Sequence, residues 1–286
     1  MRITVLSDHT TEQLQKREQE RQMKYETEMQ TYEGKLRARQ DRIDGARESR
    51  RTAWNEGQHV KALFYTVPVV WHRYKKWIES HYRPVKELPG VEDCIWQQGQ
   101  DGEDSLTEFL AQALNDEWNL LRGYKNPKGE VDQILVGPDG IFAVEVKNYK
   151  GVISCDGNYW TRNKNDAWGN QVLFDEPITD RGGRSPARQV NESADLLETF
   201  LRKTMPSCRV CRNVIFTDAE AEIGALRNLT VDGAFLLRDF SVRDMLREST
   251  TGLTATEVDM IVHQIARDHR YYQQRRQVNR MRRPAA

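Results

Sequence analysis

The sequence predicts an α/β fold: a mixed central sheet flanked by helices, with a long N-terminal helical extension and a basic C-terminal helix. Apolar, β-prone runs lie at residues 131–136, 141–146, 210–216 and 229–237, and a segment with helical periodicity lies among them at residues 187–203. A long stretch dense in Glu, Gln, Lys and Arg precedes them. This order of helices and strands is typical of an α/β sandwich.

Residues 1–60 are expected to form a charged helical extension. Tyr25, Met29, Tyr32, Leu36 and Ile43 recur at intervals of three, four and seven residues, which makes a short heptad-like seam. The seam favours a partner helix in this chain, in a homo-oligomer or in a partner protein. A single solvated helix explains so short a seam equally well.

The most apolar run is residues 62–71, inside an expected connecting segment over residues 61–98. The run has about half the length of a membrane span, and Pro68 interrupts it. A packed or interfacial segment is therefore favoured over a transmembrane helix, and we do not expect membrane contact through residues 62–71. The start of the chain is too polar after Leu6 for a signal peptide, so a cytoplasmic location is expected.

A β-hairpin is predicted where residues 131–136 and 141–146 meet across a Gly-Pro-Asp-Gly turn, which has Pro and Gly where such turns favour them. With the two runs paired, Asp132 faces Glu145, and directly opposed residues share one face of a sheet. Lys147 is two residues beyond Glu145 and lies on that face as well. The hairpin therefore gathers two carboxylates and a lysine.

This cluster has a catalytic and a structural interpretation. Opposed carboxylates repel, and a divalent cation such as Mg²⁺ removes the repulsion because it prefers oxygen ligands. A lysine beside a metal-bound water suits attack on a phosphodiester. Alternatively, Lys147 forms a salt bridge with Glu130, and Asp132 points to solvent. The burial expected of both strands favours the catalytic interpretation.

Several short motifs occur in one order along the chain. They are Gly102-Glu103 at the opening of an amphipathic helix, Val131-Asp132-Gln133-Ile134, Val136-Gly137-Pro138, Gly140-Ile141-Phe142, Val144-Glu145-Val146-Lys147-Asn148-Tyr149, Gly151-Val152-Ile153, Trp160 and Ser185-Pro186-Ala187-Arg188-Gln189. Over roughly residues 99–240 the chain thereby resembles the nuclease-related domain (NERD) family of the PD-(D/E)xK, restriction-endonuclease-like superfamily. The usual Asp-His of the family is Asp132-Gln133 here. The resemblance implies a restriction-endonuclease-like core over residues 99–250.

The resemblance also implies a role for each matched side chain. Asp132, Glu145 and the carbonyl of Val146 would ligate Mg²⁺ or Mn²⁺, Glu103 would contact the ion from its helix, Lys147 would position or activate the attacking water, and Gln189 would orient the site. The residues themselves leave two alternatives open. Gln189 also suits a capping box behind Ser185, and Glu103 also suits the dipole at the start of a helix.

The C-terminal region, residues 251–286, is expected to be a helix with a basic tail. Within residues 266–286, seven arginines stand against one acid, Asp268. Arginines with Tyr271 and Tyr272 nearby suit phosphate contacts and base stacking. The candidate nucleic-acid contacts are Arg184, Arg188, Arg275, Arg276, Arg280, Arg282 and Arg283. The alternatives are a basic surface loop and a helix end whose arginines favour the dipole.

Cys208 and Cys211 have the spacing of half a zinc site, but the sequence holds no second CxxC and no nearby His pair, so a zinc site is not expected.

Taken together, the hairpin cluster and the family resemblance predict a metal-dependent nuclease that hydrolyses DNA phosphodiester bonds with Mg²⁺ or Mn²⁺ and uses no small-molecule cofactor. The alternative is a catalytically silent, nuclease-like module that binds nucleic acid and assembles a complex through its N-terminal helix.

Overall fold

The computed structural model describes residues 1–165, 171–247, 249 and 252–281, and the chain folds as two compact units. One unit comprises Met1–Glu12 together with Cys94–Ala286, and the other comprises Gln13–Asp93. The second unit is helical and is inserted between strand β1 (Arg2–Val5) and most of helix α4 (Val91–Ala113).

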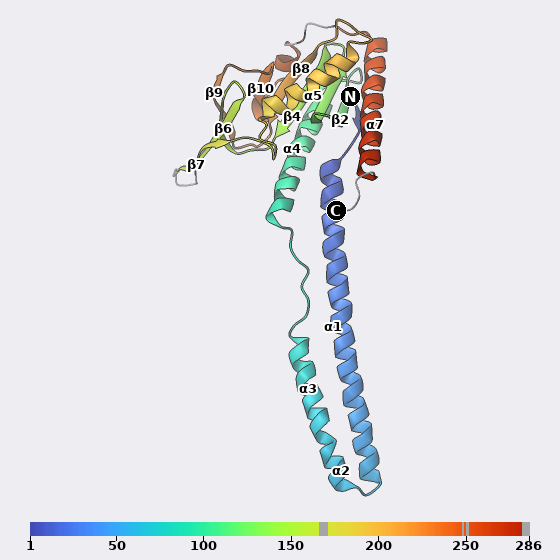
Figure 1. The fold of residues 1–286 in the computed structure, drawn as a ribbon. Helices are drawn as coiled ribbons and strands as arrows, with labels where there is room; N and C mark the ends of the chain where they lie inside the picture. Colours follow the sequence, from blue (N-terminus) through green and yellow to red (C-terminus); the bar gives the residue numbers. More distant parts are fainter. Residues whose placement is uncertain (166–170, 248, 250–251, 282–286) are drawn as a thin grey trace. The chain divides into compact units, whose positions relative to one another are not determined.

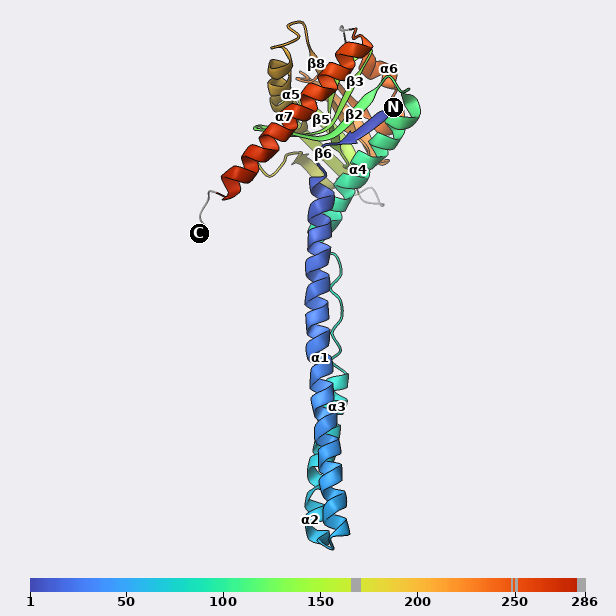
Figure 2. The same cartoon turned by 90° about the vertical axis from the view of Figure 1, so that its right-hand side faces the viewer.

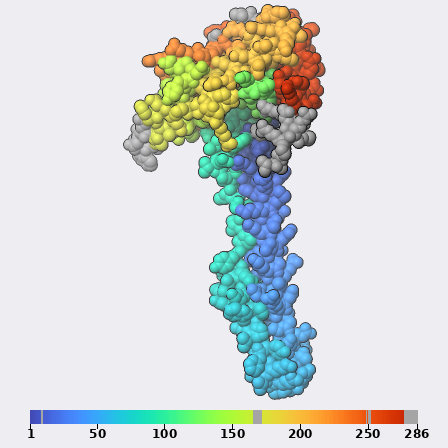
Figure 3. All heavy atoms as spheres, in the orientation of Figure 1, coloured from blue at the N-terminus to red at the C-terminus, as the bar shows by residue number. Residues whose placement is uncertain are grey.

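The helical unit contains most of α1 (His9–Asn55), with α2 (His59–Phe64) and α3 (Thr66–Ser80). Figures 1 and 3 show α2 and α3 beside the second half of α1. The Arg39 guanidinium lies 3.0 Å from the Glu79 carboxylate, and Lys76 Nζ donates to Gln40 Oε1 at 2.7 Å. These contacts place α3 antiparallel to α1, so α1 has a partner helix in this chain.

The apolar run at residues 62–71 forms α2 and the start of α3. Pro68 has no N–H to donate to the carbonyl of Phe64, and its ring clashes with a helix continued from there. This explains why α2 ends at Phe64 and α3 begins at Thr66. Among the residues that the structure describes, no helix has both the length and the apolar character needed to span a membrane.

The other unit is built on a six-stranded mixed sheet, with the order β1-β2-β3-β4-β8-β10. After β1 its strands are β2 (Asn119–Asn126), β3 (Gly129–Gly137), β4 (Gly140–Lys147), β8 (Val210–Phe216) and β10 (Gly233–Leu236). Strands β2, β3 and β4 form an antiparallel meander, whereas β1, β8 and β10 run parallel to the strands they pair with.

Helices cover both faces of this sheet. Leu106 of α4 packs on one face in a core cluster with Phe142, and α6 (Val242–Leu246) joins this cluster. Ile141 belongs to the opposite face, in a cluster with Val190 of α5 (Pro186–Leu201) and Ile261 of α7 (Ala255–Met281). Figure 2 shows α7 crossing the strands. The prediction of a mixed sheet between helices is confirmed.

A second, four-stranded sheet has the order β7-β6-β5-β9. It contains β5 (Gly151–Asp156), β6 (Tyr159–Asn165), β7 (Gln171–Pro177) and β9 (Ala221–Arg227). Trp160 of β6 is buried against Phe216, with ring centroids 5.9 Å apart, and this contact ties the small sheet to the large one.

Several predicted boundaries differ from those observed. The helix that was expected to open at Gly102 begins at Val91. The strand expected over residues 229–237 is confined to β10, and the 3₁₀ helix η1 (Leu237–Asp239) follows it. The C-terminal helix α7 begins with a capping box in which the Thr254 N–H donates to Glu257 Oε2 at 2.8 Å and the Glu257 N–H donates to Thr254 Oγ1 at 3.4 Å.

Candidate active site

The predicted hairpin forms in the predicted register, with residue 136 opposite residue 141 and residue 134 opposite residue 143. The backbone ladder between the strands runs as far as Gln133 and Val144. Beyond it, the backbone N–H of Val146 donates to Oδ2 of Asp132 at 2.8 Å. A carboxylate therefore accepts the hydrogen bond that a strand carbonyl would otherwise take, and Asp132 is held against the end of β4.

Lys147 joins two elements of the site. Its Nζ donates to Oε1 of Glu145 at 2.6 Å and to Oε1 of Gln189, on α5, at 3.3 Å. Glu145 is only 2% exposed. The alternative pairing of Lys147 with Glu130 is wrong, because Glu130 pairs with Lys125 Nζ at 3.1 Å on β2.

Gln189 faces the site because of how α5 begins. Ser185 caps the helix by accepting from the Arg188 N–H, and Pro186 is its first residue. Gln189 is one position beyond the one that a capping box uses. Its Nε2 instead donates to the carbonyl of Arg184 at 2.9 Å, which leaves its Oε1 for Lys147. The capping-box interpretation is therefore wrong.

Glu103 lies in the interior of α4, about three turns after its start. The interpretation of Glu103 as a residue that stabilises the helix dipole is therefore wrong, since that effect is confined to the first turn. Its carboxylate lies 3.6 Å from the guanidinium of Arg122 on β2, which also pairs with Asp104 at 2.7 Å.

Two residues that sequence reasoning did not assign hold α4 in place. Gln133 is fully buried, and its Nε2 donates to the carbonyl of Glu103 at 2.8 Å and to Oγ1 of Thr107 at 2.9 Å. Arg122 is the other, through its ion pairs with α4. The available signal was an arginine directly after the apolar pair Leu120-Leu121 and an amide directly after Asp132.

Gly102 allows α4 to approach the end of the sheet. A Cβ atom at Gly102 would lie 2.6 Å from Oγ1 of Thr217 and 2.9 Å from Cβ of Asn148. The Asn148 side chain also donates to the carbonyl of Gln98 at 2.7 Å. These contacts bring the helix that carries Glu103 to the segment directly after Lys147.

Burial dominates the electrostatics of the three acids. It raises the pKa of Glu145 to about 8, with a further contribution from Asp132, and it raises the pKa of Asp132 to about 7, with a further contribution from Glu103. Burial also raises the pKa of Glu103 to about 7, although Arg122 opposes this. For Lys147, burial acts to lower the pKa, but the carboxylates of Glu145 and Asp132 together outweigh it and raise the pKa. Lys147 therefore keeps its proton at neutral pH.

Comparison with known families assigns this region. Residues 98–217 match the family model of the nuclease-related domain. This part of the chain is similar to the nuclease-related domain. The match contains every candidate catalytic residue, from Glu103 to Gln189, whereas the helical unit lies outside it. No curated protein and no solved structure matches the chain.

The nuclease-related domain offers oxygen donors of the kind that Mg²⁺ and Mn²⁺ prefer. Oε2 of Glu145 is buried, and no hydrogen bond partner for it exists among the described residues. Those residues contain no group of three His, Cys, Asp or Glu side chains placed to hold a metal. The direct side-chain ligands of a bound ion would therefore be two carboxylates, those of Asp132 and Glu145. This number suits Mg²⁺, which commonly binds proteins through one or two carboxylates together with water.

The candidate nucleic-acid contacts of the nuclease-related domain are already engaged within the chain. Arg184 pairs with Asp180 at 2.7 Å and donates to the carbonyl of Lys128, and it acts to lower the pKa of Glu145. Arg188 pairs with Glu192 at 2.7 Å, and its side chain is 58% exposed.

The remaining candidates lie on or after α7. Arg275 donates to the hydroxyl of Tyr271 at 3.4 Å. The side chains of Arg276 and Arg280, and all of Arg282 and Arg283, lie outside the described residues.

Proposed function

We propose that the nuclease-related domain is a metal-dependent nuclease that hydrolyses DNA phosphodiester bonds at Asp132, Glu145 and Lys147. One observation carries the proposal: Asp132 and Glu145 are carboxylates in a largely buried hairpin, Lys147 is their shared cation, and Oε2 of Glu145 has no hydrogen bond partner among the described residues. Such an arrangement is costly for stability, and sites of strongly perturbed pKa are frequently functional.

The charges of the site support a cation there. When ionised, Glu103, Asp132 and Glu145 carry three negative charges. The positive charges beside them are those of Lys147 and Arg122. Arg122 is shared with Asp104. We assign Asp132, Glu145 and the carbonyl of Val146 as ligands of Mg²⁺ or Mn²⁺, with Glu103 reaching the ion through water. When bound, the ion would lower the pKa of a water and stabilise charge on the phosphate.

The chain's own groups then divide the remaining work. Lys147 is protonated at neutral pH, so it acts as a hydrogen-bond donor that holds the attacking water or its hydroxide and does not act as a base. Gln189 accepts from Lys147 Nζ and fixes the direction of the ammonium group. Arg184 and Arg188 are assigned to the DNA backbone, together with Arg275, Arg276, Arg280, Arg282 and Arg283. Arginine suits this task because its planar fork matches phosphate oxygens.

The proposal is tested by incubating the full chain with supercoiled plasmid and with linear single- and double-stranded DNA. Mg²⁺ or Mn²⁺ is supplied, and EDTA, Glu145→Ala and Lys147→Ala serve as controls. Cleavage that requires the metal and is lost in both variants supports the nuclease. Nicking of circles indicates an endonuclease, and cutting of linear DNA alone indicates an exonuclease. Absence of cleavage by the folded wild type with either metal would refute the proposal.

One observation favours the second candidate, a catalytically silent module that binds nucleic acid. Nζ of Lys147 already pairs with Oε1 of Glu145 at 2.6 Å, which neutralises this carboxylate without a metal. The two candidates differ at Lys147. In the enzyme, Lys147→Ala loses cleavage and retains DNA binding. In a silent module, the substitution alters neither the binding nor the assembly function.

A further inference from the structure

The helical unit exposes an apolar face at α2 and α3. We define this apolar face by Val60, Leu63, Phe64, Val67, Trp71 and Trp77, each of which is more than half exposed. Their spacing places them on one side of the two helices. The opposite side supplies Ala62 and Val69, which are buried. Soluble proteins seldom expose contiguous apolar side chains over such a length without a partner that covers them.

The charge around this face is strongly positive. Residues 35–83 contain twelve Lys and Arg residues against five Asp and Glu residues, a net charge of +7 with His neutral. Several of these cations are free to meet a partner. Among the described residues, Arg50, Arg51, Lys61 and Arg73 have no carboxylate within ion-pair distance. The helical unit is therefore an apolar surface with a basic border.

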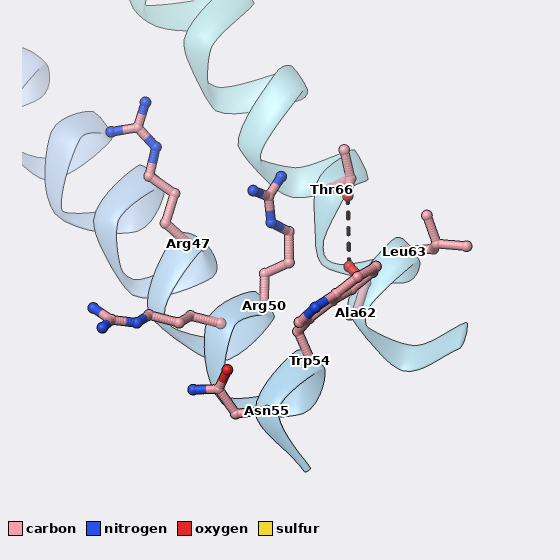
Figure 4. A pocket seen from close by; sticks show the side chains of 8 residues that line it. Arg47, Arg50, Trp54, Asn55, Ala62, Leu63 and Thr66 are labelled. Atoms are coloured by element: carbon pink, nitrogen blue, oxygen red, sulfur yellow. Dashed lines mark hydrogen bonds between the residues drawn. The ribbon is translucent and has the colours of Figure 1, made fainter. Parts of the chain in front are cut away.

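A pocket connects the basic and the apolar parts. It has a volume of about 640 Å³ and lies between the end of α1 and the α2–α3 junction. Arg47, Arg50 and Arg51 line it from α1, while Leu63 and Thr66 line it from the other side. Figure 4 shows Arg50 and Trp54 reaching from α1 toward α2 and α3. The pocket offers guanidinium groups next to an apolar wall, which suits the phosphate of an amphiphile.

Three kinds of partner differ in how well they complement the apolar face and the positive charge around it. A second copy of the chain would cover apolar side chains but would bring together two surfaces of charge +7. A nucleic acid would neutralise the charge and stack on Trp71, but it would leave aliphatic side chains such as Val60 and Val67 in water. An anionic lipid surface meets all the features: acyl chains cover the aliphatic residues, Trp lies at the headgroup level, and lipid headgroups neutralise Lys and Arg.

We propose that the helical unit docks through residues 47–77 on an anionic lipid surface, with the apolar face inserted at the headgroup boundary and the arginines of α1 on lipid phosphates. This departs from the expectation drawn from residues 62–71 alone. The sequence run suggested a packed or interfacial segment without membrane contact, whereas the structure leaves most of its apolar side chains exposed beside unpaired arginines. The docking is peripheral and is independent of the proposed nuclease activity.

The test is flotation of the full chain with two kinds of vesicle, phosphatidylcholine alone and phosphatidylcholine with about 30 mol% phosphatidylserine. Leu63→Glu/Phe64→Glu removes apolar contact, and Arg50→Glu/Arg51→Glu reverses charge. Met23→Glu is the matched control, because Met23 is an exposed apolar residue of α1 outside the basic segment. All of these positions are exposed, so we expect the variants to fold.

We expect the wild type and Met23→Glu to float with the anionic vesicles and to be released by high salt. Each double variant is expected to bind roughly tenfold more weakly or worse. The proposal is overturned if the wild type does not float, if it floats equally with neutral vesicles, or if the double variants float like the control. Sedimentation and DNA retention of the same proteins identify the rival partners. A dimer or a DNA complex that Leu63→Glu/Phe64→Glu abolishes, without flotation of the wild type, assigns the face to a second copy or to nucleic acid.

Discussion

Nζ of Lys147 lies 2.6 Å from Oε1 of Glu145, two residues earlier on β4, and 3.3 Å from Oε1 of Gln189 on α5. One ammonium group thereby links the central strand to the helix that covers it. The same charge raises the fraction of Glu145 and Asp132 that is ionised at a given pH. Substitution of any one of these residues is therefore expected to change the protonation of the others.

The first prediction concerns stability and pH in the absence of divalent metal. The pKa values of Glu145 and Asp132, about 8 and about 7, lie above their usual values of 4.5 and 3.8. Between these pH values the folded state retains protons that the unfolded state has released. The contribution of the two carboxyls to the free energy of unfolding is therefore complete below pH 4 and falls as the pH rises toward 8. Each of the two carboxyls contributes on the order of 4 kcal/mol to this loss. Urea unfolding at a series of pH values in EDTA measures it.

Glu145→Gln separates this effect from general pH dependence. The variant has no titrating group at residue 145, so its free energy of unfolding should vary less between pH 5 and 8 than that of the wild type. Glu222→Gln, at an exposed position, should follow the wild type. Parallel profiles for all three proteins would contradict the assignment of the titration to Glu145.

The second prediction is that Mg²⁺ or Mn²⁺ raises the midpoint of thermal unfolding, and does so more at pH 8 than at pH 6. Carboxylate ligands must release their protons before a metal binds, so affinity rises as pH passes the pKa values of Asp132 and Glu145. A metal at a hundred times its dissociation constant stabilises the fold by about 2.7 kcal/mol. Glu145→Ala should abolish the shift, and an unchanged shift in this variant would place the metal elsewhere.

A third prediction concerns the two glycines of α4. Gly102→Ala places a Cβ 2.9 Å from Cβ of Asn148, so the helix must move away from the sheet. Overpacking of this kind costs about 1–3 kcal/mol. Gly99 has no atom within 4 Å of the corresponding position, so Gly99→Ala should stabilise the helix by about 0.5–1 kcal/mol. Opposite signs in denaturant unfolding confirm the close approach, and equal effects would disprove it.

Gln133→Ala is the fourth prediction. It leaves the carbonyl of Glu103 and the hydroxyl of Thr107 without the amide that holds them, and it opens a small cavity. The expected loss is about 1–3 kcal/mol in the free energy of unfolding. Gln97→Ala removes a hydrogen bond on the exposed side of the same helix and should change stability by less than about 0.5 kcal/mol. An equal loss of unfolding free energy for Gln97→Ala and Gln133→Ala would argue against a stabilising role for the hydrogen bonds of Gln133 between α4 and β3.

The hairpin was predictable because its determinants are local. A Gly-Pro-Asp-Gly turn and two apolar runs fix the register, and the register places Asp132, Glu145 and Lys147. The start of α4 was not predictable in the same way. Gly99 and Gly102 lower helix propensity, but packing of Leu106 and Leu110 against the sheet outweighs this.

The remaining differences arise from contacts that are distant in sequence. Strands β5, β6, β7 and β9 mix polar and apolar residues without a long apolar run, and their sheet exposes much of its surface, so they lack a clear apolar pattern. Arg122 of β2 meets Glu103, and Gln133 of β3 meets Thr107, only once α4 lies on these two strands. No local pattern contains that information.

Strand β1 precedes the helical unit along the chain, yet it forms the edge of the large sheet beside β2. A truncation that removes residues 1–60 would therefore also uncover the hydrogen-bonding edge of β2, a template for aggregation. The two segments that flank the helical unit along the chain meet within the other unit: Gln100 Nε2 donates to Thr11 Oγ1 at 2.6 Å. The helical unit is thus an insertion between β1 and most of α4, and an internal deletion closed by a short linker would remove it while sparing the sheet. The same site could accept a foreign domain in its place.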